Sequence, residues 1–301
     1  MIVAICTHKS MLKHVPADSD ELEVPNRIRA VLDGISAFGR YTVHLKPRRA
    51  RKRELRLGHA DDYIEALSKS RFHSVGEDTF VSTGTADAAL YSAGCVLQCM
   101  DEIMSGNVQR AFAVVRPPGH HVTASGPPRG FCFLGNAALA CIKGVRSGYR
   151  VAIVDLDVHY GDGTRDILEN NICSDNFLMC SIHRQGIYPH DPRGDHGVHG
   201  PYVNHAFKRR FSDSAWKSAI SATILPQLRI FQPDIIIGSY GFDACEGDPL
   251  GECKVNPSSF ETVTTQLLKV CPNLLIALEG GYNLQNLTEG ARSVMRALIK
   301  P

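Results

Sequence analysis

Short apolar runs alternate along this chain with longer stretches in which apolar residues recur at helical spacing. The apolar runs occupy residues 2–5, 111–115, 151–154, 177–182, 235–237 and 274–278. Each is bounded by charged residues, glycine or proline, which is typical of buried parallel strands. Helical spacing covers residues 86–104, 136–145, 213–230, 258–269 and 284–299. This alternation predicts an α/β fold with a mostly parallel sheet.

Polar clusters follow four of these apolar runs directly. They lie at residues 116–121, 155–163, 241–243 and 279–282. In an open α/β sheet, the loops at the carboxyl ends of the strands form the ligand crevice. We therefore expect the four clusters to converge at one edge of the sheet.

The second cluster contains a carboxylate and an imidazole two residues apart, Asp157 and His159. Side chains i and i+2 of an extended segment point the same way, so both groups can reach one metal ion. Asp243 in the third cluster offers a further ligand, and two carboxylates with one imidazole leave an open position on a tetrahedral ion. An isolated pair of this kind more often caps a strand end, but the neighbouring clusters favour a catalytic metal site here.

Two adjacent imidazoles, His120 and His121, follow two prolines and a glycine in the first cluster. Such a pair is rarely buried without a hydrogen-bond partner for each ring, and Asp155 and Asp162 are the natural partners. An imidazole held by a carboxylate through one nitrogen keeps the other nitrogen free to accept and return a proton. Alone, adjacent histidines in a loop are more often a surface feature. Beside the metal ligands, they predict an acid–base pair.

Tyr282 follows the glycine pair Gly280-Gly281 in the fourth cluster. A phenol that faces a metal site can donate a hydrogen bond to a substrate carbonyl and stabilise the oxyanion of a tetrahedral intermediate. By itself the motif is equally compatible with a turn that packs an aromatic ring, so its interpretation depends on the other clusters.

Composition places the chain among ordinary globular proteins. Of its 301 residues, 44% are hydrophobic, so residues 1–301 can form one domain with a large core. The 33 basic and 31 acidic side chains nearly cancel, so no strong field favours direct binding of nucleic acid. The ten cysteines show no CxxC pair, and no signal peptide precedes them, which favours an intracellular, reducing compartment. No apolar run approaches the roughly 20 residues that span a bilayer, so no membrane association is expected.

With these motifs in order along the chain, the sequence resembles the zinc-dependent histone deacetylase family, which has the arginase–deacetylase fold. The resemblance runs nearly end to end and rests on clusters at residues 25–28, 116–121, 130–133, 155–163, 241–251 and 279–283. It looks closest to the class II branch, which shares the motifs at residues 247–251 and 279–283. The family's fold implies a single catalytic domain over residues 1–301, with a mostly parallel sheet flanked by helices on both faces.

The resemblance also implies a reaction and the residues that carry it out. In the family pattern, one catalytic Zn²⁺ activates a water that hydrolyses the amide of N-ε-acetyl-lysine in a histone or another protein. The positions that match its metal ligands are Asp157, His159 and Asp243. The positions that match its catalytic groups are His120, His121, Asp155, Asp162 and Tyr282. Tyrosine rather than histidine at the last position implies an active deacetylase, unlike the feeble vertebrate class IIa enzymes.

The same resemblance implies a narrow channel for the acyl-lysine side chain. The positions that match its lining are Gly130, Phe131, Tyr188 and Leu250. Relatives that prefer acetylated polyamines carry an acidic residue where this chain has Leu250, so leucine implies protein substrates. Asp61 lies where relatives contact the substrate backbone at the channel rim, although Asp62 could take that place and Asp61 could equally be a plain surface residue.

The family further implies structural monovalent cations, K⁺ or Na⁺. In one such site, the backbone carbonyls of three residues bind the ion together with two further residues. The matching residues here are Asp155, Asp157, His159, Ser181 and Ile182.

Other functions stay open at this stage. The site could serve an amidohydrolase that acts on acetylpolyamines or on lysines with long acyl chains. From a different class, the chain could be a non-catalytic acetyl-lysine-binding scaffold of a corepressor complex, although every polar catalytic position is retained. An arginase-like enzyme with two manganese ions is less favoured, because no second ligand set stands beside the first. The expected partners are an acetylated protein or peptide substrate and a corepressor complex.

Residues 46–53 form the one dense basic patch of the sequence. Such a run is typical of a nuclear-import signal or of a contact with an acidic partner, and equally of a solvated structural face. It shifts the expected location slightly from the cytoplasm toward the nucleus.

Overall fold

One nine-stranded sheet forms the centre of the protein. The computed structural model describes residues 1–17, 21–69, 75–76 and 78–300. Within them the strand order is β2-β1-β3-β9-β8-β4-β5-β7-β6, and every pairing is parallel except the antiparallel pair of β6 and β7. The strands are β1 (Val3–Cys6), β2 (Thr42–His44), β3 (Arg110–Ala113), β4 (Val151–Asp155), β5 (Phe177–Arg184), β6 (Gly197–His199), β7 (Tyr202–Phe207), β8 (Ile235–Tyr240) and β9 (Leu274–Leu278).

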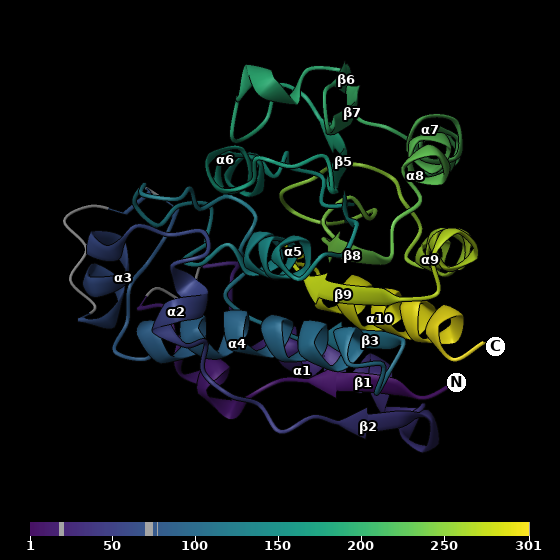
Figure 1. Ribbon diagram of the computed structural model, residues 1–301. Coiled ribbons are helices and arrows are strands. Elements are labelled where there is room, and N and C mark those ends of the chain that lie inside the picture. The colour runs from purple at the N-terminus through teal and green to yellow at the C-terminus, as the bar shows by residue number, and fades with distance from the viewer. Residues whose placement is uncertain (18–20, 70–74, 77, 301) are drawn as a thin grey trace.

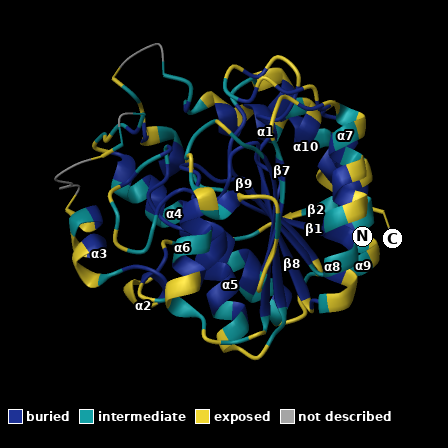
Figure 2. Ribbon diagram, turned by 90° about the horizontal axis from the view of Figure 1, so that it is seen from above, coloured by how far each residue is buried: buried dark blue, intermediate teal, exposed yellow. Residues whose placement is uncertain are grey.

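Helices cover both faces of this sheet, as expected (Figure 1). One face carries α4, α5 and α6, and the other carries α1, α10, α9 and α8, an arrangement that is also clear from above (Figure 2). The helices are α1 (Asn26–Ser36), α2 (Lys52–Leu55), α3 (Asp61–Ser68), α4 (Thr85–Met104), α5 (Asn136–Arg146), α6 (Asp162–Asn171), α7 (Asp213–Ala219), α8 (Leu225–Phe231), α9 (Ser259–Val270) and α10 (Leu284–Leu298). Every helix of the described residues is too short or too polar to cross a membrane.

The six strands predicted from apolar runs are all present, as β1, β3, β4, β5, β8 and β9. Three strands were not predicted, and they lie at the two ends of the strand order: β2 at one end, β7 and β6 at the other. The two outermost, β2 and β6, have only three residues each and expose most of them to solvent. Short edge strands of this kind carry no continuous apolar run, because they need not be buried on both faces.

The predicted helix over residues 213–230 is interrupted. α7 passes through a π-helical turn at Ile220–Ile224 and continues as α8. Pro226 lies in the first turn of α8, and proline has no N–H for the regular hydrogen bond to the preceding turn. The wider π turn absorbs that loss, because it shifts the hydrogen-bonding register just before the proline.

The strands lie in a buried layer between the helices (Figure 2). All residues of β1, β3, β4, β8 and β9 are buried, and each large apolar side chain removed from water contributes roughly 1.5–3 kcal/mol to folding. Nine of the ten cysteines are buried as free thiols, so they pack as small apolar side chains.

A buried ion cluster joins the N-terminal segment to the loops at the carboxyl end of the sheet. Arg116, three residues after β3, donates from Nε and Nη2 to the two carboxylate oxygens of Glu23 at 2.7 Å each. Arg27 of α1 donates from Nη1 to the same carboxylate at 3.0 Å. All three side chains are fully buried. Burial opposes ionisation of Glu23, but Arg116 and Arg27 together hold its pKa below the usual range.

We predict that Glu23→Gln strongly destabilises the protein, because it leaves two buried guanidinium groups without their shared carboxylate. Removing one partner of a buried ion pair typically costs about 3–5 kcal/mol. Chemical denaturation of the variant measures the change in unfolding free energy. Glu65→Gln is the matched control, since Glu65 pairs with Lys69 on the surface, and it should leave stability almost unchanged. Equal stability of the two variants would contradict the structural role of the cluster.

Candidate active site

The four polar clusters converge at the carboxyl edge of the sheet. They follow β3, β4, β8 and β9, which are neighbours in the order β3-β9-β8-β4. The loops that leave these strands therefore lie side by side, as the sequence predicted for the crevice of an α/β sheet.

Asp157, His159 and Asp243 form a buried group that can hold a metal ion. One ligand atom from each side chain lies within 4.8 Å of the other two. His159 directs its Nδ1 at both carboxylates, 3.0 Å from Asp157 Oδ1 and 3.2 Å from Asp243 Oδ2. The predicted ligands are thus brought together by the frayed end of β4 and by the loop after β8.

Main-chain amides orient both carboxylates. Val158 N–H donates to Asp243 Oδ1 at 2.9 Å, and Gly280 N–H donates to Asp157 Oδ2 at 2.8 Å. Glycine is required at position 280, since a Cβ there would lie 2.2 Å from Asp243 Oδ2. The loop after β9 can therefore approach the carboxylates closely enough to bond them.

The charges of the group fit a cation. Burial, and then the neighbouring carboxylate of Asp157, raise the pKa of Asp243 to about 7. Burial works against protonation of His159, but its hydrogen bonds to the two carboxylates raise its pKa to about 10. The two buried acids thus compete for a single positive charge, and a divalent cation would satisfy both of them. Two carboxylates and one imidazole also form the ligand set of a metal site that keeps an open position.

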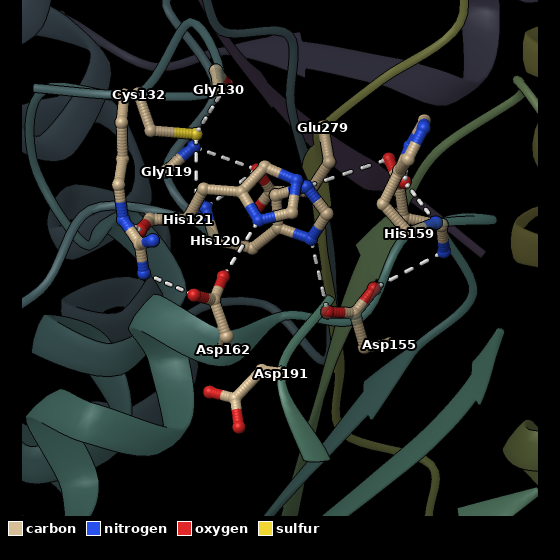
Figure 3. Close-up of polar contacts among 12 residues, drawn as sticks. Gly119, His120, His121, Gly130, Cys132, Asp155, His159, Asp162, Asp191 and Glu279 are labelled. Carbon is tan, nitrogen blue, oxygen red and sulfur yellow. Dashed lines mark hydrogen bonds and ion pairs between the residues drawn. The ribbon is translucent and has the colours of Figure 1, made fainter. Parts of the chain in front are cut away.

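The predicted histidine pair lies beside this group, each ring held by its predicted aspartate (Figure 3). His120 Nδ1 lies 3.2 Å from Asp155 Oδ2, and His121 Nδ1 lies 2.8 Å from Asp162 Oδ1. The two ring centroids are 3.9 Å apart, and all four side chains are buried. His121 Nε2 is therefore left for another partner, as a general base requires, whereas His120 Nε2 lies 3.8 Å from Asp157 Oδ2.

The two histidines differ in their electrostatic surroundings. Burial opposes protonation of His120, but the carboxylates of Asp157 and Asp155 raise its pKa well above the ordinary value. Burial, followed by the charge of His120, lowers the pKa of His121 to about 4 in spite of Asp162. His121 is accordingly the neutral member of the pair, whose free nitrogen can accept a proton.

Three residues that support these groups were not predicted. Arg129 forms an ion pair with Asp162 and donates from Nε to the His121 carbonyl at 3.0 Å. Asp248 accepts hydrogen bonds from the main-chain amides of Tyr282 at 2.7 Å and Asn283 at 3.1 Å. Glu279 accepts from the main chain before His120. Each is a charged residue in or near one of the motifs. The direction in which its side chain points depends on the loop conformation, which the spacing of residues in the sequence does not predict.

Tyr282 lies over the buried ion cluster. The guanidinium carbon of Arg27 is 5.0 Å from the centroid of its ring, and Arg27 Nε donates to the Gly281 carbonyl at 2.6 Å. The ring also packs against Phe131, with the centroids 5.5 Å apart. The tyrosine is therefore a fixed part of the site rather than a ring on a freely exposed turn.

A cavity of about 250 Å³ opens onto the site. Its lining includes all four residues that the resemblance assigned to a substrate channel, together with side chains from the metal group, the histidine pair and the tyrosine loop. The lining residues are Asp78, His121, Gly130, Phe131, His159, Ile187, Tyr188, Leu250 and Tyr282.

Asp61 does not line this cavity. It begins α3, its side chain is 61% exposed, and its carboxylate pairs with Arg56 at 2.7 Å. Asp78 lies at the cavity instead, where its Oδ1 accepts a hydrogen bond from Gly130 N–H at 3.1 Å. A contact of Asp61 with the substrate backbone stays a prediction, and Asp78 is a lining residue that the sequence analysis did not name.

The residues assigned to a monovalent cation lie on adjacent strands. Asp155 of β4 pairs in register with Ser181 of β5, and Ile182 follows it. Ser181 Oγ is 2.8 Å from His183 Nδ1. Cation binding by this segment stays a prediction.

Known proteins are similar to this chain in sequence and in fold. Residues 21–298 match the histone deacetylase domain family. Histone deacetylase 15 of Arabidopsis thaliana is 35% identical over 293 residues, which cover 92% of this chain and 52% of that protein. Polyamine deacetylase HDAC10 of Danio rerio is 30% identical over 304 residues, which cover 93% and 44%. The crystal structure of the HDA15 HD domain matches with a TM-score of 0.91 at 33% identity, covering 99% of this chain and 89% of that one.

The chain spans about half the length of the curated relatives it matches. The match to the HDA15 HD domain extends over 99% of this chain, whereas the family model covers residues 21–298, which exclude β1. The match to one family over nearly the whole sequence, together with this common fold, establishes that the chain belongs to the histone deacetylase domain family.

Proposed function

We propose that this chain is the catalytic domain of a zinc-dependent protein-lysine deacetylase that hydrolyses the amide of N-ε-acetyl-lysine. One observation carries the proposal: a single cavity joins apolar walls to a metal ligand, a neutral imidazole and a phenol. That combination matches a neutral amide on a long apolar stem, which is the chemistry of an acetylated lysine.

The walls of the cavity discriminate between the acetylated and the free side chain. Phe131, Tyr188 and Leu250 supply apolar surface for the four methylene groups of lysine. A charged ammonium would lose far more hydration free energy between these apolar side chains than a neutral amide would. The free lysine product is therefore bound more weakly than the substrate.

Asp157, His159 and Asp243 would hold Zn²⁺, on which the family generally depends. Bound zinc supplies Lewis acidity for the amide carbonyl and lowers the pKa of a water molecule. The remaining work falls to side chains of the protein, which hold the amide, move the proton and stabilise the developing charge.

His121 is the proposed general base. Its Nδ1 is held by Asp162, its ring lines the cavity, and its low pKa keeps it neutral. Nε2 would accept a proton from the attacking water and then deliver it to the amine that leaves. His120 would remain protonated, since it faces two carboxylates, and would stabilise the negative charge that develops on oxygen at the reacting carbonyl.

Tyr282 would donate a hydrogen bond to the oxygen of the scissile carbonyl. Burial raises the pKa of its phenol well above the ordinary value, although Arg27 works in the opposite direction. The phenol therefore keeps its proton at neutral pH, as a hydrogen-bond donor to an oxyanion must.

Leu250 supports an acetylated protein as the substrate, rather than an acetylated polyamine. It offers no charge to a second ammonium group in the cavity. Overall similarity does not decide the matter, because relatives named as histone deacetylases and one named as a polyamine deacetylase are of comparable identity. A purely acetyl-lysine-binding role is less well supported, because the site retains every group that the hydrolysis needs.

A nuclear location and a corepressor complex stay predictions. In the basic run, Arg48 donates to both oxygens of Glu54 at 2.7 Å and pairs with Asp101, so it belongs to a structural ion network. Arg51, Lys52 and Arg53 are exposed, and only they and their exposed neighbours could meet an import receptor.

Zinc should stabilise the folded protein. At a free concentration 100 times the dissociation constant, we expect a gain of about 2.7 kcal/mol over the metal-free form. Thermal unfolding with and without Zn²⁺ measures this gain, and it should be lost in Asp243→Asn. Asp61→Asn is the control, because its carboxylate lies on the surface away from the site. A response of Asp243→Asn equal to that of the parent protein would remove Asp243 from the ligand set.

Tyr282→Phe should lower kcat for an acetyl-lysine peptide by about 100- to 1,000-fold, the usual cost of losing an oxyanion donor. KM and zinc content should change little, since the ring remains in place. Tyr149→Phe is the matched control: its hydroxyl donates to the Met104 carbonyl at 2.9 Å and does not line the cavity. Unchanged turnover in Tyr282→Phe would refute the role assigned to the phenol.

A substrate panel tests the interpretation of Leu250. The protein should hydrolyse acetyl-lysine peptides with a higher kcat/KM than N-acetylated polyamines. Leu250→Glu should raise the relative activity on the polyamine about fivefold, as expected for a solvent-accessible ion pair of roughly 1 kcal/mol. Leu250→Gln, similar in size and neutral, should not. Preference of the parent protein for the polyamine would contradict this part of the proposal.

A further inference from the structure

Glu279 is the first residue after β9, at the middle of the catalytic edge. In the sheet β9 lies between β3 and β8, so a side chain at its end can reach the loops of both neighbours. The side chain of Glu279 is fully buried behind the histidine pair (Figure 3). None of the roles assigned above to the chemistry uses it.

The Glu279 carboxylate accepts three hydrogen bonds from the two neighbouring segments. Oε2 accepts from the main-chain N–H of Gly119 at 2.7 Å and of His120 at 3.2 Å. Oε1 accepts from Ser239 Oγ, within β8, at 3.2 Å. One carboxylate thus connects two segments: the backbone at the histidine pair and strand β8, which precedes Asp243.

The main chain around Glu279 is anchored as well. Its N–H donates to the Tyr240 carbonyl at 2.8 Å, and its carbonyl accepts from Arg27 Nη2 at 2.5 Å. The next residue, Gly280, donates its N–H to the metal ligand Asp157. The position of the carboxylate relative to the metal group is therefore fixed from both sides.

Stability alone does not explain a carboxyl group at this place. Within the described residues, no lysine, arginine or histidine nitrogen forms an ion pair with it. Burial of an acid without a paired cation is costly, and an uncharged amide could accept the same two main-chain hydrogen bonds. Both main-chain amides donate to the same oxygen, Oε2. These bonds therefore require a side chain long enough to place one acceptor oxygen there, but they do not require a negative charge.

We propose that Glu279 is a positioning residue whose hydrogen bonds to Gly119 and His120 hold the histidine pair in place relative to the metal ligands. The inference rests on the proposed function, since it assigns the consequence of that placement to turnover. A displacement of about 1 Å in a reacting group can cost on the order of 100-fold in rate. Loss of these bonds should therefore act on kcat, while the cavity walls and KM stay as they are.

Two conservative variants separate reach from charge. Glu279→Gln keeps the length of the side chain: its carbonyl oxygen can accept from both amides, and its NH₂ group can donate to Ser239. Glu279→Asp keeps the charge but is one methylene shorter. We expect Glu279→Gln to stay within about threefold of the parent kcat and Glu279→Asp to lose about 30- to 100-fold, with KM and zinc content unchanged. Ser239→Ala is a control that spares both main-chain bonds, and it should cost less than about threefold.

Hydrogen exchange supplies a readout that does not depend on catalysis. The amides of Gly119 and His120 should exchange faster in Glu279→Asp than in the parent or in Glu279→Gln, while peptides from β5 and α9 stay unchanged. Equal or greater loss of kcat in Glu279→Gln than in Glu279→Asp would overturn the proposal in favour of a role for charge. Unchanged exchange and full activity in Glu279→Asp would overturn it as well. If the parent protein fails to deacetylate any acetyl-lysine peptide, the proposed function falls, and exchange alone then decides whether Glu279 holds the loop.

Discussion

The structure of the catalytic edge depends on burying two carboxylates, Asp157 and Asp243, around one point in space. Each loses its hydration there, and each repels the other, so neither would remain ionised in this position without compensation. The compensation comes from directed groups: one imidazole, the amides of Val158 and Gly280, and room for a cation. The parallel sheet makes the arrangement possible, because it delivers the loops of adjacent strands to the same place.

Support for this edge comes from behind it, in layers. Asp155 and Asp162 orient the two imidazoles, and Arg129 in turn holds Asp162. Deeper still, the cluster of Glu23, Arg27 and Arg116 ties the loops after β3 and β9 to α1. Each catalytic imidazole is thus held in place by a carboxylate, and the carboxylate of Asp162 is held in turn by Arg129. This arrangement limits the rearrangement that the reacting side chains undergo during a reaction.

Sequence reasoning predicted the catalytic edge better than the periphery, and the reason is physical. Buried strands must be apolar throughout, so six of them could be found, and strand ends must lie at one edge, so the positions of Asp157, His120 and Tyr282 followed. The edge strands β2 and β6 satisfy no such constraint. Loop residues escape it as well: Asp78 lines the cavity but was not predicted, because the path of a loop depends on contacts that no periodicity records.

Arg116 is hydrogen-bonded to the N-terminal segment of the chain, which bears on how far the protein can be shortened. Its Nη1 donates to the carbonyls of Met11 at 2.7 Å and His14 at 2.5 Å, both upstream of residue 21, where the match to the family model begins. β1, an interior strand, lies there too. A shortened version of the protein that begins at residue 21 would therefore lose a sheet strand and two carbonyl acceptors of a guanidinium group beneath the reaction centre.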